Sequence, residues 1–208
     1  LIERERVTTW NSVPALMELL AEWRGGALDS LRVVMLSGDW IPLTLPPRIQ
    51  AVAPRASLFS LGGATEASIW SILYPIERVE PEWKSIPYGF AMDNQSFHVL
   101  NAKLEPSPDW VAGQLYIGGI GVARGYWRDS EKTASRFITH PATGEILYAT
   151  GDLGRFLPDG AIEFLGREDF QVKVQGHRIE LGEIETTMSA HPEADAVVVS
   201  AAGDPRGD

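Results

Sequence analysis

The sequence has no cysteine, which excludes disulfide bonds and thiolate metal sites among its 208 residues. It has no apolar run near the ~20 residues that a membrane-spanning helix needs, and no signal-peptide pattern. Basic residues are scarce: 18 Lys and Arg stand against 28 Asp and Glu, giving a net charge of -10. Because nucleic-acid and acidic-membrane surfaces need clustered Lys and Arg, we expect a protein that binds neither. The absence of cysteine fits the reducing cytoplasm, which is the expected location.

Several catalytic signatures are missing as well. No G-x-S-x-G elbow of a serine hydrolase is present. The glycines between 118 and 125 miss the dinucleotide-binding fingerprint by one residue, and no βαβ unit follows them. The histidines are scattered without metal-ligand spacing: His98, His140, His177 and His191.

The first third of the chain alternates helical and strand patterns. Hydrophobic residues make up 44% and charged residues 22%, which is ordinary for a globular domain. Helical spacing from Pro14 ends at Gly25-Gly26, and 46–52 favours a second, short helix. The apolar runs 31–36 and 57–61 are typical of buried strands. This alternation predicts a layered α/β region up to about residue 75.

The pattern changes after about residue 88. Short alternating strands are expected at 97–100, 114–117, 155–157 and 161–165, with one helix at 130–137. Turns such as Pro158-Asp159-Gly160 separate the strands, which indicates an antiparallel or barrel-like sheet. A strand at 170–174, a helix at 181–190 and a strand at 196–201 then predict the start of a small α+β unit.

Two places combine glycine with groups that can handle a ligand. Gly62-Gly63-Ala64-Thr65-Glu66 follows a predicted strand; its glycines allow a close backbone approach to phosphate, and Glu66 offers oxygen to a hard cation. Asp152, in the predicted turn Thr150-Gly151-Asp152, has two acceptor oxygens that can bind two hydroxyl groups at once. The alternatives are a plain strand-ending turn and an Asp bonded to its own turn.

Four ordered motifs support a family resemblance: GGATE at 62–66, GQLYIGGIGVARGYW at 113–127, YATGDL at 148–153 and GREDFQVKVQGHRIELGEIE at 166–185. Together they resemble the adenylation domains of nonribosomal peptide synthetases, which belong to the adenylate-forming (ANL-type) enzymes. The resemblance implies an α/β fold with a β-barrel-like portion. Residues 1–169 would be the C-terminal portion of the large subdomain, and 170–208 the truncated start of the small α+β subdomain.

The resemblance also implies roles for single residues. Gly62, Gly63, Ala64 and Thr65 would contact the phosphates of ATP, Thr65 and Glu66 would be catalytic, and Glu66 would bind Mg²⁺. Asp152 and Arg167 would contact the ribose; a surface ion pair is the alternative for Arg167. Asp169 would be the hinge, with Lys173 and Gly176 on the face that receives the carrier's phosphopantetheine. The family has an aromatic residue at the position of Gly62, so Leu61 or a backbone surface would replace its ring. Ala149 stands where a basic residue is common.

The family's substrate-pocket positions can be matched one by one to residues of this sequence: Asn11, Met35, Ser37, Leu61, Ile69 and Trp70. This set resembles the pocket for L-cysteine in thiazoline-forming siderophore modules, and LGGATEASIWSI and SGDWIP also resemble that subgroup. A small apolar pocket closed by Trp70 suits a polarizable thiol. Serine is the competitor, because an apolar pocket rejects an added hydroxyl only ~10²-fold. Ordinary core packing would suit the same residues equally well.

The implied activity is amino-acid adenylation by ATP, followed by transfer of the acyl group to the thiol of a peptidyl carrier protein. The family's phosphate loop, the aspartate for the substrate's amino group and the late lysine are not in this sequence, so we expect the chain alone to be inactive and to come from a longer polypeptide. A small MbtH-like activator and an inserted methyltransferase domain are possible partners. An acyl-CoA or aryl-acid ligase, a serine-activating domain and an inactive docking scaffold remain alternatives.

Overall fold

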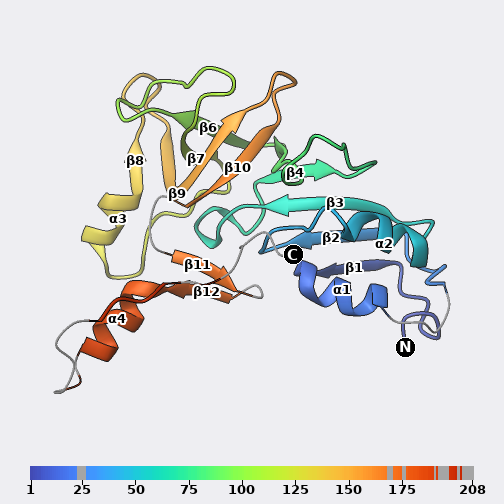
Figure 1. Ribbon diagram of the computed structural model, residues 1–208. Helices are drawn as coiled ribbons and strands as arrows, with labels where there is room; N and C mark the ends of the chain where they lie inside the picture. The colour runs from blue at the N-terminus through green and yellow to red at the C-terminus, as the bar shows by residue number, and fades with distance from the viewer. Residues whose placement is uncertain are drawn as a thin grey trace.

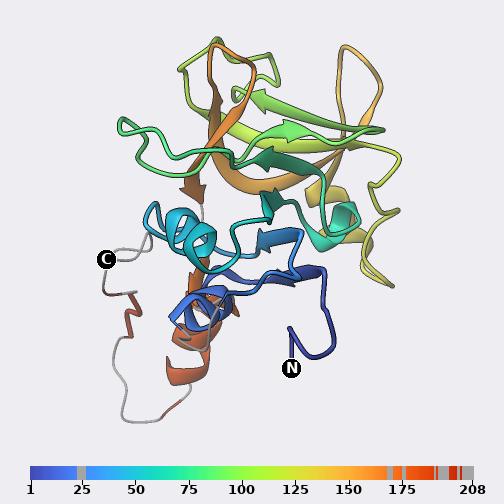
Figure 2. The same ribbon diagram turned by 90° about the vertical axis from the view of Figure 1, so that its right-hand side faces the viewer.

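The computed structural model describes residues 1–22, 27–167, 171–174, 177–189, 191, 197–200 and 202. These residues form an α/β layer followed by a curved antiparallel sheet, which lies above the α/β layer in Figures 1 and 2. This arrangement confirms the predicted fold class, an α/β fold with a barrel-like portion. No helix in the described part of the chain is long and apolar enough to cross a membrane.

The first sheet has the strand order β1-β2-β3-β4-β5. Its strands are β1 (Thr9–Ser12), β2 (Val33–Ser37), β3 (Ser57–Gly62), β4 (Ile72–Pro75) and β5 (Phe90–Ala91). The first three strands run parallel, and β4 and β5 then join antiparallel. The predicted strands at 31–36 and 57–61 are confirmed to within two residues, whereas β1 was not predicted.

Two helices cover one face of this sheet (Figure 2): α1 (Pro14–Glu22) and α2 (Leu45–Val52). Met17 and Ile49 on the helices are fully buried in one core with Val34 and Leu36 of β2. Because strand side chains alternate, Met35 and Ser37 project from the opposite face. The predicted end of the first helix, Gly25-Gly26, lies outside the described residues.

The second sheet has the strand order β10-β9-β7-β6, with β8 also paired to β9. Its strands are β6 (Gln95–Leu100), β7 (Gly113–Gly119), β8 (Phe137–Thr139), β9 (Ile146–Phe156) and β10 (Ile162–Arg167). Helix α3 (Ser130–Arg136) begins after Asp129, whose side chain accepts a hydrogen bond from the Lys132 N–H at the helix start. The prediction of a turn at 150–152 is wrong, because these residues lie within the continuous strand β9.

The segment at 88–89 joins the two sheets. The Tyr88 N–H donates to the Ile162 carbonyl at 2.7 Å, and the Ile162 N–H donates to the Gly89 carbonyl at 2.8 Å. A Cβ at Gly89 would lie 2.1 Å from the Leu73 carbonyl oxygen, so this close crossing requires glycine. Tyr88 is therefore held by its backbone against the first residue of β10.

A separate antiparallel pair follows, formed by β11 (Gln171–Val174) and β12 (His177–Glu180). Helix α4 (Leu181–Ser189) begins directly after β12 and confirms the predicted helix at 181–190 within the described residues. The strand predicted at 196–201 is wrong where it can be compared, because residues 197–200 belong to no strand.

Candidate active site

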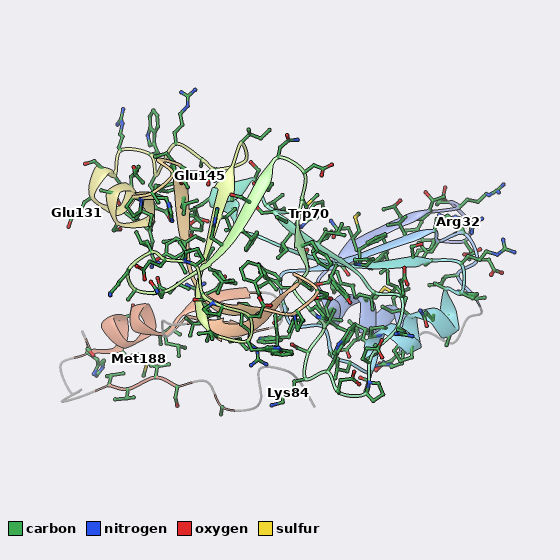
Figure 3. All side chains as sticks on the ribbon, turned by 90° about the horizontal axis from the view of Figure 1, so that it is seen from above. Arg32, Trp70, Lys84, Glu131, Glu145 and Met188 are labelled. Carbon is green, nitrogen blue, oxygen red and sulfur yellow. The ribbon has the colours of Figure 1, made fainter. Side chains whose placement is uncertain are left out.

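A cleft of about 290 Å³ opens where the carboxyl ends of β2 and β3 approach the β9–β10 hairpin. Crevices at the carboxyl ends of parallel strands are common ligand sites in open α/β sheets. The lining comes from the ends of β1, β2 and β3 with the segments that follow them, from the segment before β5 and from the hairpin: Val13, Ser37, Gly38, Asp39, Trp40, Ile41, Ser60, Leu61, Gly62, Gly63, Ala64, Thr65, Ile69, Trp70, Ile86, Tyr88, Asp152 and Phe164. Trp70 lies between the two sheets in Figure 3.

Asp152 reaches the cleft because β9 bulges at this point. The register between β7 and β9 shifts here, so that Leu115 faces the stretch from Thr150 to Asp152. Gly151 has a φ of 77°, in the left-handed region that favours glycine. Thr150 Oγ1 donates to the Leu115 carbonyl at 2.7 Å and accepts from the Asp152 N–H at 3.0 Å. The bulge re-aims the Asp152 side chain toward the cleft.

Arg167 holds the Asp152 carboxylate. The two residues are register partners on β10 and β9, and Arg167 Nη1 donates to Asp152 Oδ1 at 2.9 Å. Their side chains are only 12% and 17% exposed, so the pair is screened less by solvent than a surface ion pair. A ligand with neighbouring hydroxyl groups would meet an acceptor of fixed orientation here.

The loop after β3 approaches the cleft with its backbone. Gly63 has a φ of 144°, and a Cβ there would lie 2.6 Å from the Ile69 carbonyl oxygen. Only glycine fits this position, which leaves the backbone of Gly63 open to the cleft. Ser68 and Ile69 both have left-handed φ, 63° and 69°, which is strained for a β-branched residue such as Ile69. The loop is held in this shape by the hydrogen bond from Ser68 Oγ to the Gly121 carbonyl at 2.8 Å.

Thr65 and Glu66 lie on the short 3₁₀ helix Thr65–Ala67. Thr65 is exposed and lines the cleft, whereas Glu66 is not among the described lining residues. The Tyr126 hydroxyl donates to Glu66 Oε1 at 2.7 Å, and the Ala123 N–H donates to the Glu66 carbonyl at 2.8 Å. Burial, and then this hydrogen bond to Glu66, raise the pKa of Tyr126 above its usual range. Tyr126 therefore stays protonated and keeps donating to the carboxylate.

The donor chemistry at Glu66 fits one mode of metal binding. Within the part of the chain that the structure describes, no group of three or more His, Asp or Glu side chains could enclose a metal ion. Mg²⁺ is commonly held by one or two carboxylates together with substrate phosphate oxygens. A single carboxylate oriented by a tyrosine hydroxyl is compatible with that mode.

The six predicted pocket residues fall into two groups. Asn11, Met35, Ser37 and Leu61 share one sheet face, because the register pairs Asn11 with Met35 and Ser37 with Leu61. This is the face opposite α1 and α2. Ser37 and Leu61 line the cleft with Ile69 and Trp70, whereas Asn11 and Met35 lie further back on the same face and outside the lining. Asn11 is exposed and Met35 is half-buried.

The sequence analysis missed several lining residues, among them three aromatic side chains: Trp40, Tyr88 and Phe164, here called the aromatic wall. Ring centroids lie 4.9 Å apart for Trp40 and Phe164 and 5.6 Å apart for Tyr88 and Phe164. The resemblance of SGDWIP to the cysteine-type subgroup pointed to the neighbourhood of Trp40 only. Tyr88 stands alone between Pro87 and Gly89, and no periodicity marks it as part of a site.

The remaining predicted residues follow β10 in the sequence. Asp169 and Gly176 are outside the described residues, as is Glu168 of the charged junction. Lys173 is placed on β11, opposite Arg178 of β12. The proposed boundary near residue 169 lies between β10 and β11.

Comparison with known proteins agrees with this geometry. The family model of AMP-binding enzymes matches residues 1–127. Pyochelin synthetase PchF of Pseudomonas aeruginosa is 50% identical over 208 residues, which cover 98% of this chain and 11% of that synthetase. The structure of the nonribosomal peptide synthetase FmoA3 in its alpha-methyl-L-serine-AMP bound form matches with a TM-score of 0.78 and 48% identity, over 88% of this chain and 21% of that one.

A third match is NpsA-ThdA from Klebsiella oxytoca, an artificially fused adenylation–PCP di-domain of a nonribosomal peptide synthetase. It matches with a TM-score of 0.84 and 30% identity, over 99% of this chain and 39% of that one. The matched structures share the α/β fold described here, with sequence identities of 48% and 30%. The chain belongs to the family of AMP-binding enzymes, and within it resembles the adenylation domains of nonribosomal peptide synthetases. It spans about a tenth of the pyochelin synthetase that it matches.

Proposed function

We propose that the protein carrying this chain activates an amino acid as its adenylate. One observation carries the proposal: Asp152, the backbone of Gly62-Gly63 and Thr65 line one cleft although they come from different sheets. In the reaction, the carboxylate of the amino acid attacks the α-phosphorus of ATP. A new bond forms between the carboxylate oxygen and the α-phosphorus. The bond from the α-phosphorus to the oxygen that bridges to the β-phosphate breaks, and pyrophosphate leaves.

The chain's own side chains bind and orient the reactants. Asp152, held by Arg167, accepts hydrogen bonds from the ribose hydroxyls and so fixes the nucleotide. Thr65 donates its hydroxyl to phosphate, and Gly63 allows phosphate to approach the backbone. Glu66, oriented by Tyr126, contributes a carboxylate ligand to Mg²⁺. Bound Mg²⁺ would neutralise charge on the phosphate oxygens.

For the substrate we propose L-cysteine. The cleft near Trp70 is walled by Leu61 and Ile69, with Ser37 as a polar side chain on the same surface. Such a lining suits a small side chain with a polarizable sulfur atom. The similarity to a pyochelin synthetase agrees with the predicted siderophore type of module.

L-Serine is the second candidate, and a specific observation favours it. The FmoA3 structure, which is 48% identical, has alpha-methyl-L-serine-AMP bound. Ser37 could exchange a hydrogen bond with a substrate hydroxyl, whereas a thiol is a weaker partner. The choice depends on whether the Ser37 hydroxyl contacts the substrate side chain.

The second half of the proposed activity is thioester formation on a peptidyl carrier protein. The adenylation–PCP di-domain among the structural matches supports such a partner. We further propose that residues 1–169 are the C-terminal portion of the large adenylation subdomain and that residues 170–208 begin the small subdomain. Asp169 would be the hinge between the two subdomains. Lys173 and Gly176 would face the carrier's phosphopantetheine. A small MbtH-like activator and an inserted methyltransferase remain part of this proposal.

Pyrophosphate exchange by the full-length protein that carries this chain tests the proposal. Cysteine, serine, alpha-methylserine and an aryl acid are compared at saturating ATP. Cysteine should give the largest kcat/KM, and Ser37→Ala should lower serine exchange more than cysteine exchange. A preference for serine would refute the substrate assignment, and a preference for the aryl acid would refute amino-acid activation. Absence of exchange with all four would refute the adenylation proposal.

A further inference from the structure

The phenol of Tyr88 occupies the space that a side chain at position 62 would need. A Cβ built on Gly62 would lie 1.8 Å from Tyr88 Cε2, 2.4 Å from Cζ and 2.7 Å from the hydroxyl oxygen. No real Cβ tolerates such contacts, so a side chain at position 62 and the present Tyr88 conformation exclude each other. Gly62 is therefore the space into which this ring fits.

Tyr88 is anchored at both ends. Its hydroxyl accepts a hydrogen bond from the Gly63 N–H at 3.0 Å, and its backbone N–H donates to Ile162. The ring also packs edge-on against Phe97 at 5.8 Å and in a tilted contact with Phe164 at 5.6 Å. These contacts fix the ring without a nucleotide, so binding would cost little side-chain entropy.

The ring shares the cleft with Asp152. Both residues line it, together with Trp40 and Phe164 of the aromatic wall. Burial, and then the negative charge of Asp152, raise the pKa of Tyr88 far above its usual range. The phenol therefore stays neutral and presents an uncharged aromatic surface near the carboxylate.

We propose that Tyr88 is the aromatic contact for the nucleobase of the bound nucleotide, and that Gly62 provides room for it. The inference rests on the proposed function, in which Asp152 binds the ribose. A base attached to that ribose must lie within one glycosidic bond of the sugar, and the ring of Tyr88 is a rigid flat surface that lines the same cleft as Asp152. Aromatic side chains are common platforms for bases, because every base has a π-face. Leu61, which is 5% exposed, offers less surface to a base.

The test measures the KM for ATP in pyrophosphate exchange by the full-length protein. Tyr88→Leu should raise the KM for ATP by roughly 5- to 150-fold, the range expected for loss of one base–aromatic stack. The KM for the amino acid should stay within about threefold, because the pocket near Trp70 is unchanged. Tyr88→Phe keeps the ring and loses only the bond to Gly63, so its KM for ATP should lie closer to that of the unchanged protein.

Two further variants separate base binding from general damage. Tyr74→Leu removes a tyrosine that also packs on aromatic rings, Trp83 and Phe90, but lies outside the cleft lining, so it should not change the KM for ATP. If Tyr88→Leu fails to fold, the double variant Gly62→Ala with Tyr88→Leu fills part of the vacated space and should show the same rise.

Three results would overturn the inference. These are an unchanged KM for ATP in a folded Tyr88→Leu variant, an equal rise in the KM for the amino acid, and a larger effect from Tyr88→Phe than from Tyr88→Leu. Failure of the proposed function is distinguishable, because the unchanged protein would then show no exchange with any amino acid. A protein that exchanges normally but does not respond to Tyr88 would refute only the nucleobase contact.

Discussion

The Thr150 hydroxyl holds the bulge of β9 that positions Asp152. Replacing Thr150 with valine removes this hydroxyl but keeps nearly the same side-chain volume, so it tests the hydrogen bonds alone. The side chain is 5% exposed, and its Oγ1 takes part in two hydrogen bonds, one to the Leu115 carbonyl and one from the Asp152 N–H. Valine has nearly the same shape but cannot form either bond. Both backbone groups would then lose their partner within the bulge.

The expected cost follows from these two bonds. A buried polar group left without a partner costs about 1–3 kcal/mol. Two fully dry groups would cost about 2–6 kcal/mol. We expect a loss of about 2–4 kcal/mol in the free energy of unfolding, because water can partly reach the Asp152 N–H near the cleft. The matched control is Thr150→Ser, which keeps the hydroxyl and loses one buried methyl group, at a cost of about 0.8 kcal/mol.

Urea unfolding, followed by tryptophan fluorescence, measures the free energy of unfolding of both variants. At an unchanged m-value, the midpoint should fall clearly further for Thr150→Val than for Thr150→Ser. Thr150→Val should also raise the KM for ATP in the full-length protein, because the Asp152 backbone is no longer fixed. Equal destabilisation by the two variants would show that the hydroxyl does not hold the bulge.

Three further predictions concern single side chains. Asp152→Asn should raise the KM for ATP in pyrophosphate exchange by about 10- to 150-fold, since charged hydrogen bonds contribute about 1.5–3 kcal/mol, while the exposed control Asp109→Asn should have no effect. Burial, and then the Glu66 carboxylate, raise the pKa of Tyr148 above its ordinary value of 10.0. The unfolded chain therefore loses this proton first, so the free energy of unfolding should fall as pH rises above about 10, and less steeply in Tyr148→Phe; an equal slope in urea titrations would contradict this. Arg155→Ala should lower the free energy of unfolding by about 1–2 kcal/mol, because Arg155 bonds Glu163 at 2.6 Å and lies 4.9 Å from the Trp110 ring centroid; Arg128→Ala, whose cation–π contact with the exposed Trp127 lies on the surface, should cost less.

The sequence predicted most of the regular elements because their patterns are local. The apolar runs of β2 and β3 and the helical spacing of α1 lie within the elements they define. Strand β1 was missed because Thr-Trp-Asn-Ser has no apolar run, and it forms only by pairing with the edge of β2. Thr150-Gly151-Asp152 has the composition of a turn, yet the pairing of β9 with β7 makes it a bulge.

The site was predictable where motifs named residues and unpredictable where distant segments meet. Asp152 and Thr65 were expected from short motifs, and both line the cleft. Tyr88 enters the site because its backbone pairs with Ile162, 74 positions away along the chain. No property of the Pro-Tyr-Gly segment shows that pairing. The glycine at position 62 is related to Tyr88, because its missing side chain leaves the space that the Tyr88 ring occupies, but this relation is visible only in the structure.

Successive side chains of β2 point to opposite faces of the sheet, and under the proposed function this alternation separates core residues from substrate-pocket residues. Val34 and Leu36 are fully buried under the helices, whereas Met35 and Ser37 project from the opposite face of the same strand. Under the proposed function, changes at Met35 and Ser37 would alter substrate selectivity at a small cost in stability, because Val34 and Leu36 keep the core under the helices. A mutant library confined to the half-buried positions 35 and 37 should consequently yield many folded variants, whereas changes at the buried Leu61 would cost stability.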